Sequence, residues 1–497
     1  MFLSEWCNSN NRLSLFFTIC CIIDLFGVFP VIALPRAIIE CGWLGMPLAF
    51  FVFFIQIYTA IMLGRCWIIA ENLQFGILEK NRYPYSAVVE LAYGKMCSKY
   101  VNLILRLAVF GGSIPNLIVA AQNFHLIGLK VSSYQLDFSY CYWIIILGVI
   151  LCPFMWLGSP KDLKWLAAIS VGFVLLSSFL TWFCLLNGKT PSNPFIPNPT
   201  WESAAIAYGI LSFQFDIHPT ILTIQVDMKN RNQLGKAIII AFIASGSLFL
   251  ITTIICYVCY GNAVRYNTLQ GLEPSESLYA NFIVVTVQIS LSMVVGVTPL
   301  FQDLEEKANI PVGFGWRRCF LRSGVVLGAV FLAEIVPRFD LIMGLIGGAL
   351  MGQLMFVFPP LLYARLRSLQ AQFKARLLPR YFPIGYGSIR EIATDRAWIV
   401  GNHARVDLSM EDHLDKPHLF QRRTEQDRNS ILPFVDLQGE QVSIVEKISN
   451  VLLIIFGVLA TLLSTYYTLK GTIEYADFTP SCITNVTLAS QLIYKFA

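Results

Sequence analysis

The stretch that decides the fold is Ser212-Phe213-Gln214-Phe215-Asp216-Ile217-His218-Pro219, a polar interruption inside an otherwise apolar segment. A second interruption, Gly27-Val28-Phe29-Pro30, lies in the first apolar segment and is followed by Pro35. Proline has no backbone N–H and clashes with the preceding turn, so neither stretch can continue a regular helix. At membrane depth, backbone groups freed in this way are tolerated only where they line a cavity. The two stretches therefore predict two broken helices that meet at a site.

The composition places both stretches in a membrane protein. Of the 497 residues, 56% are hydrophobic and only 13% are charged, whereas about 25% of a soluble domain is charged. A membrane-spanning helix needs about 20 consecutive, mostly apolar residues. Eleven windows fit this requirement, some with a charge or a break: 13–35, 41–64, 100–129, 138–160, 165–188, 201–219, 237–264, 277–302, 319–337, 341–364 and 448–469.

The positions of the two interruptions predict an internal repeat. Windows 13–35 and 201–219 are the first members of two successive sets of five. Interrupted segments at matching positions of two halves are typical of transporters built from inverted repeats, with the substrate bound near the midplane. We therefore expect an all-α membrane protein of eleven helices, a five-plus-five inverted repeat with one further helix. Two unrelated proline kinks are the alternative.

Four regions follow from this arrangement. They are a transmembrane core of ten helices over 1–365, a cytosolic and mostly disordered loop over 366–445, the eleventh helix over 446–469 and a tail over 470–497. The excess of Lys and Arg on one side predicts a cytosolic N-terminus and an extracytosolic C-terminus. Asn485 begins an Asn-Val-Thr sequon in the tail and is the predicted glycosylation site. The plasma membrane and a lysosomal or vacuolar membrane both fit.

Three stretches in and after the sixth window form a recognisable pattern: Tyr208-Gly209-Ile210-Leu211-Ser212-Phe213, His218-Pro219 and Gln225-Val226-Asp227-Met228-Lys229. Through them the chain resembles the amino acid/auxin permease family, also called the amino acid transporter transmembrane family, which contains proton-assisted and sodium-coupled neutral amino acid transporters. The first window is similar too, through Leu34-Pro35-Arg36-Ala37 and the following Gly42-Trp43. The resemblance implies a leucine-transporter-like fold and amino acid transport.

The first window departs from that family at three positions. The two glycines usual in the family fall on Val28 and Pro30, and Gly27 is displaced by one residue. Arg36 takes the place of the usual tyrosine. These departures concern the segment in which we expect the substrate to bind.

The interrupted stretches supply the predicted substrate-binding residues. The N-terminal ends of broken helices suit an anion, and the C-terminal ends suit a cation, so a zwitterionic amino acid can use both. The predicted residues are Gly27, Val28, Phe29, Pro30, Ser212, Phe213, Gln214 and Phe215.

Ion coupling is predicted from the polar residues of the apolar windows. Asp24 and Asp216 are carboxylates at membrane depth, where such a group marks function by default. Burial favours the uncharged form of a carboxyl group, so either can carry a proton, and His218 can share it. Sodium is the alternative, because Thr286 and Ser290 are four residues apart and present oxygens on one helix face.

We therefore expect a secondary active transporter, a symporter that carries small amino acids by alternating access, with a proton preferred over sodium. The alternative is a non-transporting amino acid sensor that uses the same pocket. The sequence has only five histidines, and its one Cys-x-x-Cys pair, Cys256 and Cys259, lies within an apolar window and is interpreted as helix packing. We therefore expect no enzyme, no metal site and no cofactor besides the coupling ion. We expect the bilayer and an amino acid as partners and no nucleic acid, and leave the oligomeric state open.

Overall fold

The computed structural model describes residues 12–74, 76–77, 83–132, 139–156, 164–191, 194–311, 313–335, 339–377 and 444–475. These residues are almost entirely helical, and among them the one pairing of extended backbone is a bridge between Leu13 and Met228. Contacts divide the chain into a larger unit, Met1–Leu366 with Ser449–Ala497, and a smaller one, Arg367–Ile448. Apart from residues 367–377 and 444–448, which belong to helices named in the next paragraph, everything described below lies in the larger unit. The predicted glycosylation site Asn485 and most of the predicted loop lie outside the described residues.

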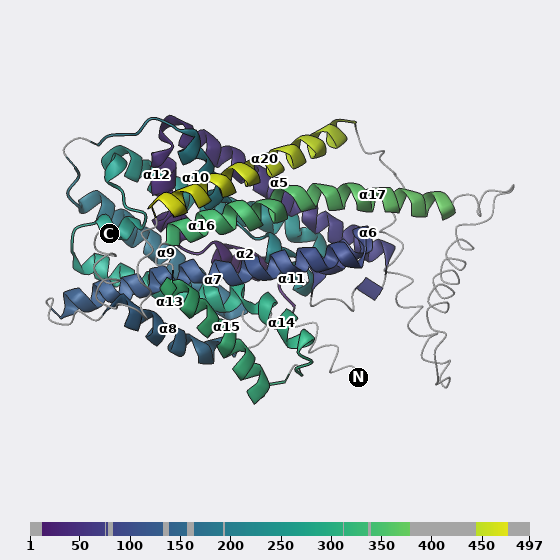
Figure 1. Ribbon diagram of the computed structural model, residues 1–497, viewed down its shortest axis with the longest axis horizontal. Coiled ribbons are helices and arrows are strands. Elements are labelled where there is room, and N and C mark those ends of the chain that lie inside the picture. The colour runs from purple at the N-terminus through teal and green to yellow at the C-terminus, as the bar shows by residue number, and fades with distance from the viewer. Residues whose placement is uncertain are drawn as a thin grey trace. The chain divides into compact units, whose positions relative to one another are not determined.

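The described helices occur along the chain in the following order. Their bounds are α2 Leu15–Phe26, α3 Phe29–Ile32, α4 Leu34–Glu40, η1 Gly42–Leu44, α5 Gly45–Leu73, α6 Pro84–Tyr93, α7 Lys95–Val131, α8 Tyr140–Met155, α9 Lys164–Asn187, α10 Trp201–Gln214, α11 His218–Asp227, η3 Arg231–Gln233, α12 Leu234–Cys259, η4 Gly261–Ala263, η5 Thr268–Gly271, α13 Glu276–Gly296, α14 Thr298–Lys307, α15 Trp316–Ile335, α16 Phe339–Ile346, η6 Gly347–Met351, η7 Gln353–Val357, α17 Phe358–Leu377 and α20 Ile444–Tyr475 (Figure 1).

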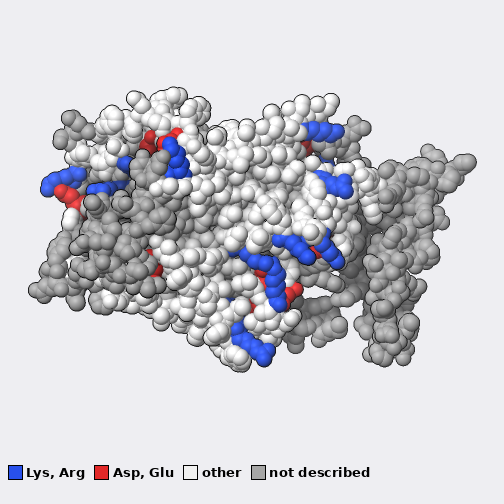
Figure 2. All heavy atoms as spheres, viewed as in Figure 1, with Lys and Arg blue, Asp and Glu red and all other residues white. Residues whose placement is uncertain are grey.

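Eight helical segments of the described residues are long and apolar enough to cross a membrane. Figure 2 shows charged side chains gathered toward two ends of the visible face, with uncharged side chains between them. The chain is therefore a multi-pass integral membrane protein. The predicted windows 138–160 and 319–337 correspond to α8 and α15, and the window 201–219 corresponds to α10 and the start of α11. These helices are shorter or more polar than those eight. The count of eleven and the inverted repeat remain predictions.

The predicted break in the first helix is confirmed. The helix α2 ends at Gly27, whose φ of +60° is a conformation that glycine adopts at little cost. The short helix α3 follows with Pro30 in its first turn, and α4 starts afresh with Pro35 in its first turn. Gly27 itself, displaced by one from the family's pattern, thus provides the flexible backbone, so Val28 and Pro30 need not be glycines.

The predicted break in the sixth helix is confirmed as well. The Thr200 side chain caps the start of α10 by accepting from the Ser203 N–H at 3.0 Å. Three residues, 215–217, separate the end of α10 from α11. Pro219 lies in the first turn of α11, where its missing N–H is not needed.

The helix α10 packs against the π-helix η6 with almost no side chain between them. A Cβ added to Gly347 of η6 would lie only 1.9 Å from the Gly209 carbonyl oxygen of α10. A Cβ on Gly348 would lie 2.5 Å from the Ser464 hydroxyl of α20. Small residues allow such close approach of helices in membranes. The contact between α10 and η6 is therefore a backbone-to-backbone seam.

Arg36, which replaces the family's tyrosine, ties α4 to the segment after α12. Its guanidinium donates to the Asn262 carbonyl oxygen at 2.6 Å and to the Val264 carbonyl oxygen at 3.1 Å, and pairs with Glu40 at 2.8 Å. The Tyr266 hydroxyl donates to the same Glu40 carboxylate at 3.1 Å. Burial, and then the Glu40 charge, raise the pKa of Tyr266 well above its ordinary value, so this hydroxyl stays a donor.

Replacement of Arg36 by Ala is expected to lower the free energy of unfolding by about 1–2 kcal/mol, because several charge-assisted hydrogen bonds to a half-buried group are lost. Arg36→Lys recovers little, because an ammonium cannot match the planar guanidinium fork. Thermal unfolding in detergent measures both. Lys189→Ala is the control, since the Lys189 side chain is 87% exposed beside Glu273. An equal loss in that variant would contradict the assignment.

Candidate functional site

A cavity of about 110 Å³ lies where the two broken helices meet. That volume is well above the ~10–15 Å³ that one water molecule requires, so the cavity has room for a small solute. Gly27 and Phe29 form part of its wall from the first break, and Phe213, Gln214 and Asp216 from the second. The sequence thus placed the two breaks at one site.

Four of the predicted substrate-binding residues do not line this cavity. These four residues, which are buried away from the cavity, are Val28, Pro30, Ser212 and Phe215. Phe215 packs in an aromatic cluster, with its ring centroid 5.2 Å from that of Phe26 and 5.3 Å from that of Phe53. Phe215 thus packs in the core between α2, α5 and α12 and does not line the cavity.

Asp216 and His218 form a pair at the second break. The His218 N–H donates to Asp216 Oδ1 at 3.1 Å, so the carboxylate caps the start of α11. The His218 Nδ1 atom lies 3.7 Å from the same oxygen. The imidazole is fully buried, whereas Asp216 borders the cavity. A proton that enters from the cavity therefore meets the carboxyl group first and the imidazole behind it.

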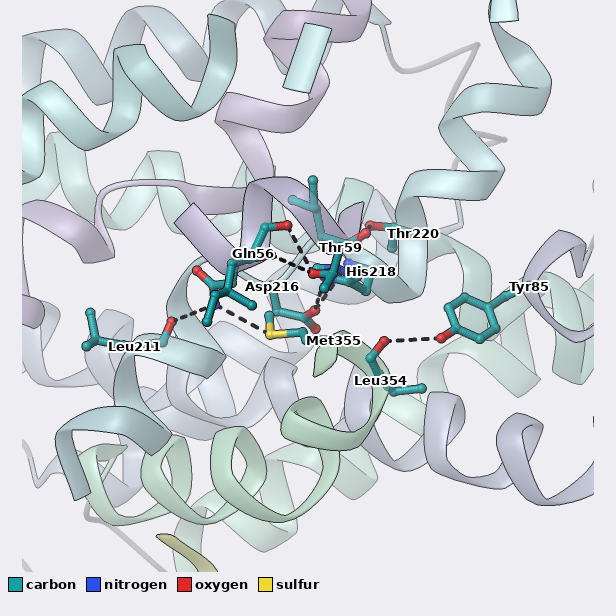
Figure 3. A network of polar contacts seen from close by, with 11 residues as sticks. Gln56, Thr59, Tyr85, Leu211, Asp216, His218, Thr220, Leu354 and Met355 are labelled. Carbon is teal, nitrogen blue, oxygen red and sulfur yellow. Dashed lines mark hydrogen bonds and ion pairs between the residues drawn. The ribbon is translucent and has the colours of Figure 1, made fainter. Parts of the chain in front are cut away.

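Thr59 of α5 contacts the Nε2 atom of His218 (Figure 3). Thr59 Oγ1 lies 3.0 Å from His218 Nε2 and 3.0 Å from the Ile55 carbonyl oxygen. The hydroxyl has one proton, which it gives either to that carbonyl oxygen or to Nε2, according to the tautomer of the imidazole. The other ring nitrogen, Nδ1, makes no hydrogen bond to any described residue.

Further polar contacts connect this pair to its surroundings (Figure 3). Gln56, one turn before Thr59 on α5, donates to the Leu211 carbonyl oxygen at 3.3 Å and to the Met355 sulfur at 3.4 Å. The Tyr85 hydroxyl donates to the Leu354 carbonyl oxygen of η7 at 3.1 Å. The network thus joins α5, α6, α10 and the π-helix next to the broken helix.

Asp24 is fully buried and does not line the cavity. The Ser170 hydroxyl of α9 lies near the Asp24 carboxyl group. Neither carboxyl oxygen makes a hydrogen bond to any described residue. The structure therefore separates the two predicted acids: Asp216 faces the cavity, and Asp24 lies behind its wall.

Thr286 and Ser290 do not reach the cavity either. The Thr286 hydroxyl donates to the Phe282 carbonyl oxygen and the Ser290 hydroxyl to the Thr286 carbonyl oxygen, both at 2.8 Å. Such bonds to the preceding turn are common for hydroxyls in membrane helices. Their predicted part in sodium binding has no support from this arrangement.

The same helix presents two other polar residues that sequence reasoning missed. Gln288 and Ser292 line the cavity from α13, and Ser113 and Asn116 line it from α7. The sequence feature that could have identified Gln288 and Ser292 is their four-residue spacing, which places both on one face of an apolar helix. Among the described residues of the wall, Asp216 is the only charged one, and the described residues contain no cluster suited to a metal ion.

Comparisons with known proteins agree with this architecture. A family model described as transmembrane amino acid transporter protein matches residues 13–384. The chain is 26% identical over 358 residues to amino acid transporter AVT1E of Arabidopsis thaliana, which covers 67% of this chain and 63% of that protein. For AVT1D of the same plant the identity is 25% over 350 residues, with coverage of 67% and 60%. The chain thus spans about three fifths of the length of these two relatives. It belongs to the transmembrane amino acid transporter family, a family of transporters and not of enzymes.

Proposed function

We propose that the chain is a secondary active transporter that carries small amino acids across a membrane by alternating access. The observation that carries this proposal is the cavity between the two breaks, because binding between discontinuous helices is how inverted-repeat transporters hold their substrates. Membership of the family supports the substrate class. In this proposal two four-helix regions rock around the cavity.

The substrate proposed is an amino acid with a small, uncharged side chain. Apart from Asp216, the described wall offers no charged side chain that would pair with a charged substrate side chain, and the rings of Phe29 and Phe213 border the space. The wall offers the amides of Gln214 and Gln288 and no described cationic side chain. The C-terminal end of α2, at Phe26 and Gly27, borders the cavity. The negative end of the helix dipole there suits the substrate ammonium.

The coupling ion proposed is a proton carried by Asp216 and His218. The carboxyl group borders the cavity, and His218 Nδ1 lies 3.7 Å from its Oδ1 atom. Protonation of the pair removes a negative charge from the cavity wall and changes the cap of α11. In this proposal proton uptake is coupled to the conformation of the helix break, which changes during transport.

The proposed topology has a cytosolic N-terminus, an extracytosolic C-terminus and a glycan on Asn485, based on the positive-inside bias and the sequon. The proposed location is the plasma membrane or a lysosomal or vacuolar membrane. Glycosidase treatment and imaging of the tagged full chain test both statements. A glycan on Asn485 would also establish that the tail is extracytosolic.

The direct test is amino acid uptake by the purified full chain in proteoliposomes. We expect uptake of small neutral amino acids that persists without sodium and increases when the entry side is acidified. Uptake that requires sodium would overturn the proton proposal. Amino acid binding without any flux or exchange would overturn transport itself and favour a sensor.

Replacement of His218 by Gln is expected to reduce proton-driven uptake at neutral pH about tenfold or more, because Asp216 loses the base behind it. Glutamine can still donate a side-chain hydrogen bond to Thr59, so the fold is retained. The measurement is initial uptake under an inward proton gradient. Tyr85→Phe, which changes the same network away from the proton pair, is expected to remain within about twofold. Equal losses in the two variants would contradict a specific role for His218.

A further inference from the structure

Two polar side chains of α13 face the broken end of the first helix. Gln288 and Ser292 are one helical turn apart, and both border the cavity. Gln288 is fully buried. A carboxamide without charge in such a place needs partners for both its oxygen and its nitrogen. Each of these two residues has a backbone group of the first helix as a partner.

The two side chains replace a single missing helical hydrogen bond. The Gly27 N–H still donates to the Ile23 carbonyl oxygen at 3.0 Å, so the next bond of a continuous helix would join the Val28 N–H to the Asp24 carbonyl oxygen. Instead, the Ser292 hydroxyl donates to the Asp24 carbonyl oxygen at 2.6 Å. The Val28 N–H donates to Gln288 Oε1 at 3.2 Å. Each half of the broken bond is thus satisfied from α13.

Gln288 is held in place from two further sides. Its Nε2 donates to the Ser170 hydroxyl of α9 at 3.2 Å. Its carboxamide lies flat against Gly27, since a Cβ on that residue would be 3.1 Å from both Nε2 and Oε1. The missing side chain at Gly27 therefore serves the contact with Gln288 as well as the positive φ.

We propose that Gln288, assisted by Ser292, is a positioning residue that holds the first helix open at Val28 and so sets the backbone wall that the substrate meets. This inference deepens the proposed function, and only its transport readout rests on that function. The pair keeps the N–H of Val28 and the carbonyl of Asp24 from rejoining into a regular turn. The charge of Asp24 plays no part in this role, because the contact uses its backbone oxygen.

The test compares Gln288→Met with Gln353→Met in the full chain. Met fills the space of Gln but makes neither hydrogen bond, whereas Gln353 donates to the Ala349 carbonyl of its own helix and does not line the cavity. Backbone hydrogen–deuterium exchange over the break reports positioning without any substrate. We expect the Val28 amide to exchange at least about tenfold faster in Gln288→Met and to be unchanged in Gln353→Met. Ser292→Ala is expected to show a smaller increase.

Uptake kinetics provide the second readout. We expect the KM of Gln288→Met to rise about tenfold with less than about threefold change in maximal rate, since the shape of the binding wall is affected and the proton pair is not. Loss of maximal rate and thermal stability at unchanged KM would show a merely structural role and overturn the proposal. Unchanged exchange at Val28 would overturn it as well. If the wild-type chain transports no amino acid, the proposed function fails, and the exchange comparison still decides the role of Gln288.

Discussion

Asp216→Asn is expected to abolish proton-driven accumulation of amino acids, with a loss of about a hundredfold or more. Asparagine keeps an oxygen that can accept the His218 N–H, so the cap of α11 and the fold remain. What is lost is the one ionisable group of the described cavity wall. The measurement is uptake into proteoliposomes under a proton gradient, set beside exchange of internal for external amino acid without a gradient.

Exchange is expected to survive in Asp216→Asn, because the cavity and both breaks are retained. Asp24→Asn is the matched control: it removes a carboxyl group of the same kind that is buried behind the wall. Full activity in Asp216→Asn together with a loss in Asp24→Asn would assign the coupling proton to Asp24. Loss of exchange as well as accumulation would show that Asp216 binds the substrate and does not only carry a proton.

Gly347→Ala is expected to lower the free energy of unfolding by at least about 3 kcal/mol. The added methyl group would lie 1.9 Å from a backbone oxygen of Gly209 and 2.8 Å from the backbone nitrogen of Phe213. Backbone atoms cannot rotate away as the end of a side chain can, so α10 and η6 must separate. Because α10 leads directly into the cavity wall, substrate binding is expected to weaken together with stability. Thermal unfolding in detergent and the yield of folded protein measure the effect.

Gly172→Ala is the control for this substitution. Gly172 lies within α9, and no atom is within 4 Å of a Cβ added there. Alanine favours a helix over glycine by about 1 kcal/mol, so this variant is expected to equal or exceed the wild type in stability. A Gly347→Ala protein as stable as the Gly172→Ala protein would contradict the close seam.

The two broken helices and their meeting point could be predicted because prolines act locally. Pro30 and Pro219 interrupt their own helices whatever surrounds them, and the polar stretch at 212–218 has no other place in an apolar segment. The displaced glycine could not be interpreted in the same way. Its role depends on a carboxamide from a helix about 260 residues later in the chain, and local sequence carries no information on that partner.

The direction of individual side chains was the other limit. Phe213 and Phe215 are two residues apart in an interrupted stretch, and helical spacing fails where the helix stops. One borders the cavity and the other packs against Phe26 and Phe242. For Ser290 and Ser292 the helix is regular, and the choice of face depends on where α2 lies. Sequence spacing alone therefore could not separate Phe213 from Phe215, and it favoured Ser290 over Ser292, the one that lines the cavity.

The bridge between Leu13 and Met228 joins the beginning of the first helix to the end of the sixth. The Leu13 N–H donates to the Asp227 carbonyl oxygen, and the Lys229 N–H donates to the Leu13 carbonyl oxygen, both at 2.9 Å. Main-chain bonds of this kind are indifferent to side-chain identity, so ordinary substitutions at these positions over evolutionary time leave them intact. Proline at position 13 or 229 is the exception, because it removes a donor. Main-chain hydrogen bonds thus join the two discontinuous helices at one end, and most substitutions there do not remove them.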